Sequence, residues 1–223
     1  MDSLDRLAEK RGDYAEAERL RHEELKLAEE LGSEVSFRLS AVGRIALLAG
    51  DHARADDYHE RARRLAVEQS YKSAEEHAEL GLAMSARRQG RYERAEELLV
   101  RWLGWLREVG GTPGLAFFLA ELGFAAEQRG DAETALALHR EGYDAALGEP
   151  RAEALALEGL AGAYSLAGDP GRAATLLGRA AALREAVGTP LAHGERHDVD
   201  RITARTLAAL GEERFHQAYG SGS

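Results

Sequence analysis

The chain contains Gly50-Asp51-His52-Ala53-Arg54-Ala55, and close variants of this stretch occur at four other places. The five copies start at residues 12, 50, 90, 130 and 168, so successive copies begin 38, 40, 40 and 38 residues apart. A nearly fixed period of this length is typical of repeat proteins. The sequence therefore predicts an array of similar units in place of one central core.

Each copy has the composition of a turn between two helices. The glycine can adopt the positive φ that often ends a helix, and an Asp after it can cap the next helix. Five residues after every glycine stands an alanine, small enough to let two helices cross closely: Ala17, Ala55, Ala95, Ala135 and Ala173. Apolar or aromatic side chains lie eight residues before and eight residues after each glycine, which predicts an apolar seam on both helices of a hairpin.

These features make the chain resemble tetratricopeptide-repeat proteins. That family has Leu-Gly in the first helix, Gly-Asp-Tyr at the turn and Ala five residues after the glycine. This chain carries Leu122-Gly123 in one unit, and Gly12-Asp13-Tyr14 with Ala17 in another. Its units are longer than the usual length of about 34 residues, and look like the longer variant found in kinesin light chains and in bacterial signalling regulators. The resemblance covers about residues 2–188 and implies an all-α, right-handed solenoid of five hairpins.

Glycine and proline junctions bound the predicted helices. The repeat helices are expected over residues 3–10 and 14–30, 34–48 and 52–69, 72–89 and 92–109, 113–129 and 132–147, and 150–167 and 170–187. Residues 1–190 would form the repeats, residues 191–219 a pair of C-terminal capping helices, and residues 220–223 a flexible tail. The first capping helix is expected over residues 191–210, with its apolar side formed by Val199, Ile202, Leu207 and Leu210.

The C-terminal part carries a second, narrower resemblance. Residues 183–191, Leu-Arg-Glu-Ala-Val-Gly-Thr-Pro-Leu, and residues 210–215, Leu-Gly-Glu-Glu-Arg-Phe, look like the C-terminal end of large ATPase-type (STAND) transcriptional regulators of high-GC bacteria. Those proteins carry a DNA-binding domain, a nucleotide-switch ATPase and then a repeat sensor domain. The resemblance implies that this chain is such a sensor domain, and the short first helix is typical of a fragment of a longer array. An intact small protein with a short first helix is the alternative.

The charge balance and the lack of cysteine restrict the function classes. The 223 residues carry a net charge of −10, whereas a nucleic-acid-binding domain usually has a basic face, so we expect no direct binding to nucleic acid. The chain has no cysteine, which excludes disulfides and fits a reducing cytoplasm. Neither an apolar run of spanning length nor a signal peptide is recognisable, and we expect a cytoplasmic protein without membrane contact.

No constellation of residues typical of catalysis stands out. The sequence has no Gly-Lys dipeptide and hence no P-loop, no Gly-x-Ser-x-Gly elbow and no His-Glu-x-x-His motif. His193 and His197 are four residues apart, but two histidines on a surface helix would hold a metal only weakly. His59 and His139 occupy the same position of their repeats and are interpreted as packing residues. We therefore expect a protein that is not an enzyme and uses no metal or cofactor.

The candidate site follows from the first resemblance, which implies that the first helices of the hairpins line a concave groove. Arg44, Arg87 and Arg88 would form a basic spot there, suited to carboxylates, with aromatic anchors beside it. The predicted partner-binding residues are Phe37, Arg44, His77, Met84, Arg87, Arg88, Phe117, Phe124, Glu127 and Gln128. The alternative interpretation makes the arginines solvated and the aromatic residues part of the core between repeats.

These inferences favour a protein-interaction or ligand-sensing module that acts as the C-terminal regulatory domain of a bacterial transcription regulator. The expected partner is a protein or peptide with an acidic segment, and self-association through the N-terminal end is also expected. Two alternatives stay open, a free-standing scaffold or adaptor and a small-molecule sensor with a pocket inside the superhelix. A long open groove would favour a peptide, whereas a closed apolar cavity would favour a small ligand.

The repeat register predicts that Ala95→Trp and Ala135→Trp disrupt folding. Overpacking a helix crossing typically costs about 1–3 kcal/mol of unfolding free energy, whereas a surface change such as Glu133→Ala usually stays within about 0.5 kcal/mol. Thermal unfolding followed by circular dichroism measures all three variants. Equal melting temperatures for Ala135→Trp and the parent would contradict the register.

Overall fold

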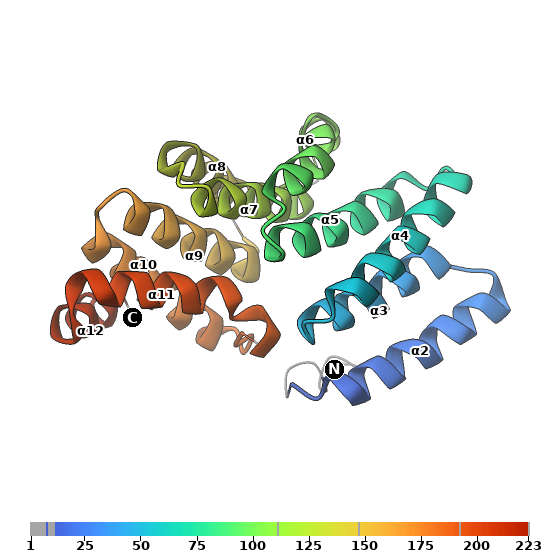
Figure 1. Cartoon of the computed structure of the whole chain (residues 1–223), viewed down its shortest axis with the longest axis horizontal. Coiled ribbons are helices and arrows are strands. Elements are labelled where there is room, and N and C mark those ends of the chain that lie inside the picture. The colour runs from blue at the N-terminus through green and yellow to red at the C-terminus, as the bar shows by residue number, and fades with distance from the viewer. Residues whose placement is uncertain (1–7, 9–11, 111, 147, 192, 223) are drawn as a thin grey trace. The chain divides into compact units, whose positions relative to one another are not determined.

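The computed structural model of the chain describes residue 8 and residues 12–110, 112–146, 148–191 and 193–222. Within these residues the protein is an all-helical, solenoid-like repeat fold without a strand (Figure 1). The predicted first helix, residues 3–10, lies outside the described residues except for Ala8, which is helical. None of the described helices combines the length and the apolar character needed to cross a membrane.

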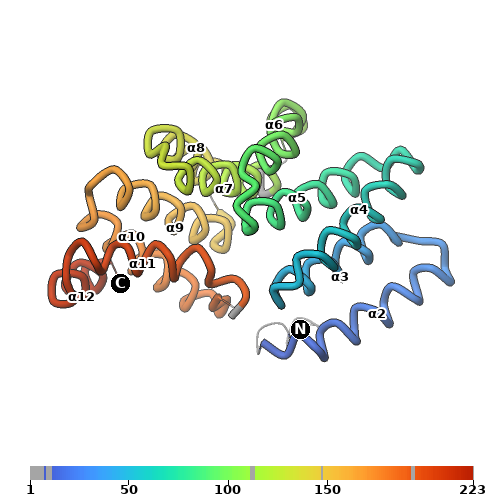
Figure 2. Tube along the Cα trace, in the orientation of Figure 1, coloured from blue at the N-terminus to red at the C-terminus, as the bar shows by residue number. Residues whose placement is uncertain are grey.

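The repeat helices follow one another as hairpins, which the Cα trace in Figure 2 shows in chain order. Helix α2 (Tyr14–Leu31) is the second helix of the first unit. Four complete pairs follow it: α3 (Val35–Leu48) and α4 (His52–Glu68), α5 (Lys72–Arg88) and α6 (Tyr92–Val109), α7 (Thr112–Gln128) and α8 (Ala132–Ala145), and α9 (Pro150–Leu166) and α10 (Pro170–Ala186). The predicted ends of these nine helices agree with the structure to within two residues.

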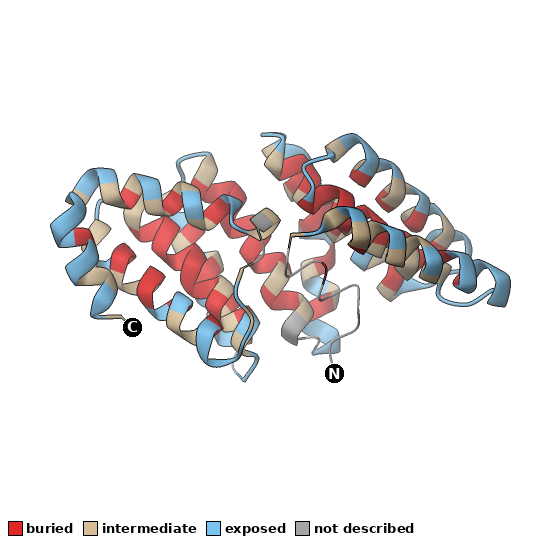
Figure 3. Ribbon diagram, turned by 90° about the horizontal axis from the view of Figure 1, so that it is seen from below, coloured by how far each residue is buried: buried red, intermediate tan, exposed pale blue. Residues whose placement is uncertain are grey.

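The chain divides into two compact units. Unit 1 comprises Met1–Leu99 together with Leu191–Glu195, and unit 2 comprises Val100–Pro190 together with Arg196–Ser223. In each unit the first helices of the hairpins are more deeply buried than the second helices (Figure 3). Helix α3 has nine buried residues where α4 has four, and α9 has eleven where α10 has six. The first helices therefore expose few side chains that a partner could contact.

The five turns are built as the sequence predicts. Their glycines have φ between 73° and 89°, a range that glycine adopts without steric strain. In four turns the Asp after the glycine accepts a hydrogen bond of 3.0–3.1 Å from the backbone N–H three residues later. The five crossing alanines, Ala17, Ala55, Ala95, Ala135 and Ala173, are all 0% exposed. These contacts confirm the predicted close helix crossings.

A histidine held between two glycines lies in the interior of unit 1. The ring of His59 in α4 faces Gly43 of α3 and Gly81 of α5. A Cβ atom added to Gly43 would lie 2.9 Å from the ring, and one added to Gly81 would lie 2.2 Å from it. The absence of a side chain at both glycines therefore leaves the space that the imidazole ring occupies.

Unit 2 contains the same arrangement. His139 of α8 is 0% exposed, and Cβ atoms added to Gly123 and Gly159 would lie 2.5 and 2.1 Å from its ring. The ring also packs edge-on against Phe124, with centroids 4.9 Å apart. Both histidines are thus packing residues, as the sequence analysis interpreted them.

The C-terminal region differs in one respect from the prediction. The expected helix over residues 191–210 is instead a short 3₁₀ turn, η1 (His193–Glu195), followed by α11 (His197–Leu210) and then α12 (Glu212–Gly220). In unit 1 the Gly194 N–H donates to the Tyr14 hydroxyl at 2.5 Å, and a Cβ atom at Gly194 would lie 2.3 Å from the Leu48 carbonyl oxygen. This close backbone approach to α3 accompanies the 3₁₀ turn and the later start of the helix.

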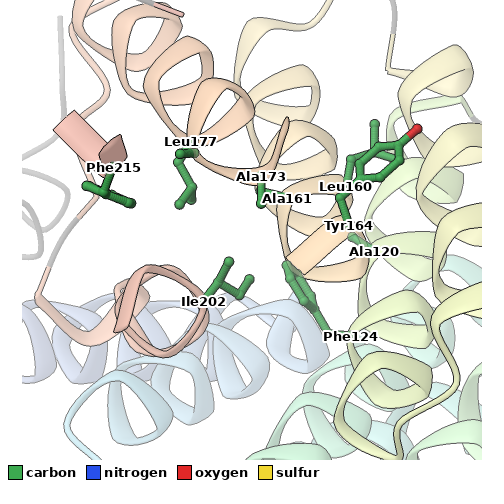
Figure 4. Packing of buried hydrophobic residues seen from close by; sticks show 10 residues of the cluster. Ala120, Phe124, Leu160, Ala161, Tyr164, Ala173, Leu177, Ile202 and Phe215 are labelled. Carbon is green, nitrogen blue, oxygen red and sulfur yellow. The ribbon is translucent and has the colours of Figure 1, made fainter. Parts of the chain in front are cut away.

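Helices α11 and α12 complete the core of unit 2. Figure 4 shows Ile202 of α11 and Phe215 of α12 directed into the same cluster as Phe124 and Leu177. Ile202 is 0% exposed and Phe215 is 5% exposed. The predicted tail begins within α12, and the backbone of Gly222 approaches α10, where an added Cβ atom would lie 2.1 Å from the Thr175 carbonyl oxygen.

The histidine–glycine packing predicts opposite effects for two glycine-to-alanine changes. Gly81→Ala should lower the free energy of unfolding by about 1–3 kcal/mol, because its methyl group collides with the His59 ring. Gly104→Ala in α6 should raise it by up to about 1 kcal/mol, because this helical glycine has nothing within 4 Å of its added Cβ atom. Urea unfolding measures both changes.

The double variant His59→Ala with Gly81→Ala supplies the control. Removal of the ring should reduce the cost of Gly81→Ala, and the difference is the coupling between the two positions. An equal cost with and without the ring would show that the collision is not the cause.

Burial of His59 also predicts acid sensitivity. Burial, with a smaller contribution from His77 and against the effect of Asp56, lowers the pKa of His59 from its ordinary value of 6.5 to about 4. The unfolded chain therefore takes up a proton near pH 6.5 that the folded chain does not bind until about pH 4, so stability falls as pH decreases through this window. Between pH 7 and pH 5 the parent should lose about 2 kcal/mol more than His59→Leu, measured by urea unfolding at both pH values. The same pH slope in both proteins would contradict this assignment.

Candidate partner-binding faces

The ten predicted partner-binding residues lie on three first helices, distributed over the two units. In unit 1 they define a surface that we name the α3–α5 face: Phe37, Arg44, His77, Met84, Arg87 and Arg88. In unit 2 Phe117, Phe124, Glu127 and Gln128 lie on α7. Together with Gly162 and Ser165 of α9, the last three of these form what we name the α7–α9 face. Each face is described within its own unit.

The α3–α5 face has an aromatic end. The Phe37 ring packs edge-on against Tyr71, with centroids 5.4 Å apart, and lies 5.7 Å from the His77 ring. Tyr71 is 42% exposed and His77 is also exposed. Tyr71 was not identified from the sequence, because it stands just before α5 and not at one of the expected groove positions.

The other end of the α3–α5 face is basic. Arg44 lies seven residues after Phe37, and hence on the same side of α3, roughly 10 Å further along the helix. Its Nη1 atom is 3.3 Å from the Glu195 carboxylate. Arg88 donates from Nη1 to the Leu47 carbonyl oxygen at 3.4 Å. The chain thus places one of its own carboxylates on the predicted basic spot.

Two members of the predicted α3–α5 set differ from the expectation of an accessible surface. Arg87 is only 2% exposed, so it adds no accessible charge to the basic spot. Met84 packs against Ala46, Leu47 and Ala55. Both positions are on a first helix, and first helices contact neighbours on more than one side.

The α7–α9 face is covered by α11. Glu127, whose side chain is 0% exposed, lies 2.5 Å from Arg201 and 2.5 Å from Arg205. Both arginines belong to α11 and lie four residues apart, on one side of that helix. The predicted partner-binding residue Glu127 therefore already has two cationic partners from the same chain.

An apolar side chain lies between these two arginines. Ile202 packs over Gly162 of α9. A Cβ atom added to Gly162 would lie 2.9 Å from the Cδ1 atom of Ile202. Arg205 donates to the Gly162 carbonyl oxygen at 2.6 Å and to the Ser165 hydroxyl at 3.1 Å, and Thr206 also contacts Ser165. Gly162, in the middle of α9, is thus where α11 approaches α9.

Arg201 and Arg205 keep the buried Glu127 carboxylate ionised. Burial alone would raise the pKa of Glu127, but the hydrogen bonds and positive charge of Arg201, together with Arg205, hold that pKa below its ordinary value. The carboxylate is therefore ionised at neutral pH. Pairing of this kind offsets the desolvation cost of burying an ionised carboxylate.

The other α7 residues of the predicted set take different positions. Phe124 is 1% exposed and belongs to the core of unit 2, which agrees with the alternative interpretation of the aromatic residues. Gln128 donates to the Asp198 carboxylate of α11 at 3.2 Å. Phe117 is half-buried. Among the described residues no group of three or more His, Asp or Glu side chains could hold a metal ion.

Sequence reasoning missed the residues that occupy the two faces. Glu195 lies on the α3–α5 face, while Arg201 and Arg205 lie on the α7–α9 face. Ile202 was assigned to the apolar side of a capping helix, but its two flanking arginines were not read as part of a binding surface. The i, i+4 spacing of two arginines around an isoleucine is the signal that could have indicated it.

Comparison with known proteins supports the fold. No protein-family model matches the chain, and no curated protein matches it. The crystal structure of BtubC (BKLC) from P. vanneervenii is similar, with a TM-score of 0.63 and 24% sequence identity over 83% of this chain and 78% of that chain. At this identity the similarity establishes an all-helical repeat-like fold and nothing further.

Proposed function

We propose that this chain is a partner-recognition module of tetratricopeptide type, whose first-helix faces bind segments of protein. The observation that carries the proposal is the docking of α11 on α7 and α9. Ile202 is the apolar anchor of this helix, and Glu127 is the ionic partner of its two arginines. A groove that takes an amphipathic helix by apolar anchors and flanking charges is a common mode of peptide recognition.

For the α3–α5 face we propose a partner segment that is acidic and carries an apolar anchor. Arg44 already pairs with the Glu195 carboxylate at 3.3 Å, which supports carboxylate binding at the basic end. The exposed rings of Tyr71 and His77, with Phe37 beside them, supply an aromatic surface for the anchor. Aromatic residues and arginine are the side chains that most often dominate binding energy at interfaces.

We further propose that the module serves as the regulatory arm of a bacterial transcription regulator of the ATPase type. The support is the sequence resemblance of residues 183–191 and 210–215 to the C-terminal end of such regulators. In that setting, binding at the module would bias the conformational equilibrium of the regulator's ATPase by its differential affinity for two states.

The α3–α5 assignment predicts a charge-dependent peptide affinity. A fluorescein-labelled peptide with a Leu or Trp anchor and two glutamates about two helical turns away should bind the parent chain. Arg44→Glu should weaken this binding about tenfold or more, because it replaces the cation that faces the carboxylate. Glu195→Gln should strengthen binding, because it removes the carboxylate that occupies Arg44. Fluorescence anisotropy at low and moderate salt measures the affinities.

The matched control is Arg61→Glu, which makes the same charge change at an exposed residue of α4 that pairs with Asp57. It should alter affinity by less than about twofold at moderate salt, where long-range charge effects are screened. If Arg44→Glu and Arg61→Glu weaken binding equally in folded proteins, the α3–α5 face is not the recognition surface.

A further inference from the structure

Helix α11 is attached to unit 2 by few buried residues. Of its fourteen residues, only Asp198, Ile202 and Thr206 are buried, whereas eleven of seventeen are buried in α9. Ile202 is the one fully apolar side chain among the three. Val199, Leu207 and Leu210 pack on the core but are only partly buried. The apolar contribution that holds α11 is therefore smaller than that which holds α9.

The polar contacts of α11 are numerous, but the fit is incomplete. Arg201 and Arg205 remain 28% and 33% exposed while they pair with Glu127. The Arg201 Nε and Gln128 Oε1 atoms are buried and have no hydrogen-bond partner in the part of the chain that the structure describes. A buried polar atom without a hydrogen-bond partner destabilises the arrangement that buries it. Gln128 belongs to the α7–α9 face, so the face can gain from an occupant that donates a hydrogen bond to its Oε1 atom.

The chain on both sides of α11 departs from regular helix. It is preceded by Gly188–Leu191, which lie outside any helix, and by the short turn η1, and it is followed by Gly211. Gly211 has φ 77° and ψ 161°, a conformation that is essentially restricted to glycine. Helix α10 ends at Ala186 and α11 begins at His197, so α11 is a separate helix.

From these observations we propose that the α7–α9 face is a binding site for a basic amphipathic helix, and that α11 is its exchangeable occupant within the chain. The partner helix carries two arginines four residues apart with an isoleucine or leucine directly after the first, the pattern of Arg201, Ile202 and Arg205. Glu127 selects the arginines, and Gly162 leaves the space for the apolar anchor.

The chemistry of this occupant is set by charge complementarity. The Glu127 carboxylate is fully buried and ionised, so an occupant without a cation would leave it unpaired at a large cost. An acidic segment, which the α3–α5 face takes, is excluded here by repulsion. The proposal builds on the role of the chain as a recognition module, but it concerns a different unit and a partner of opposite charge.

Partner binding and α11 docking are mutually exclusive in this arrangement. The apparent affinity of the chain for the partner helix is the affinity of the free face multiplied by the fraction of molecules in which α11 is undocked. Weakening α11 must therefore strengthen binding in trans. This linkage distinguishes an exchangeable occupant from a helix that is simply part of the core.

The test uses a fluorescein-labelled peptide with the sequence of residues 196–211 and the full chain. The variant Arg201→Ala with Arg205→Ala weakens the docked helix and keeps every residue of the α7–α9 face. Fluorescence anisotropy should show binding to this variant at least tenfold tighter than to the parent. The same peptide with both arginines changed to glutamate should bind neither protein, and Glu127→Gln added to the variant should weaken binding again.

The matched control is Arg196→Ala with Asp200→Ala, which removes an exposed ion pair of α11 that does not touch the face. It should bind the peptide no better than the parent. Circular dichroism establishes that each variant is folded. A folded Arg201→Ala, Arg205→Ala variant that binds the peptide no better than the parent would overturn the proposal, and acidic-peptide binding at the α3–α5 face would be unaffected by that result.

Hydrogen exchange on the parent gives a second test that needs no variant. Amides of α11 should exchange faster than those of α9, because a docked element opens without unfolding the unit. Equal protection of α11 and α9 would mark α11 as fixed core and overturn the proposal. A concentration-dependent dimer that forms by exchange of α11 between two copies would also overturn it, because the occupant would then be a second copy of this chain.

Discussion

Close approach of neighbouring helices is the constraint on which the rest of this protein depends. Small residues at the crossings bring the hairpins together, as the five fully buried alanines show. The same closeness leaves first helices packed on several sides, and this decides which of their side chains reach the surface. A cation such as Arg87 is buried by that packing, while Arg44 of α3 keeps about a third of its surface exposed.

Two faces of similar construction carry opposite charge. The α3–α5 face presents Arg44 and holds Glu195, whereas the α7–α9 face presents Glu127 and holds Arg201 and Arg205. Arg44 lies six positions before its turn glycine, and Glu127 lies three positions before its own. On both faces the C-terminal segment of the chain supplies the residues of opposite charge. A repeated backbone thus gives different binding chemistry through the charged side chains that its first helices carry at different positions.

The turns and helices were predictable from the sequence because they depend on local chemistry. Gly50 and Asp51 fix a helix end and a helix start within a few residues, and the period of the array places every other turn. The burial of Phe124 and the docking of α11 were not predictable in this way, because they depend on contacts between residues some 80 positions apart in the chain. The sequence therefore assigned the candidate residues to the first helices α3, α5 and α7, whereas their exposure and the residues that contact them required the structure.

The packing of His59 between Gly43 and Gly81 makes the residue types allowed at these three positions depend on one another, although the positions are far apart in the sequence. A side chain larger than hydrogen at either glycine collides with the imidazole, so each position limits what evolution can place at the other two. Among relatives of this chain, the three residues should change as a set, with a smaller side chain replacing histidine wherever a glycine becomes alanine. The second set, Gly123, His139 and Gly159, lies 80, 80 and 78 residues further on, which gives the array an internal period of two hairpins.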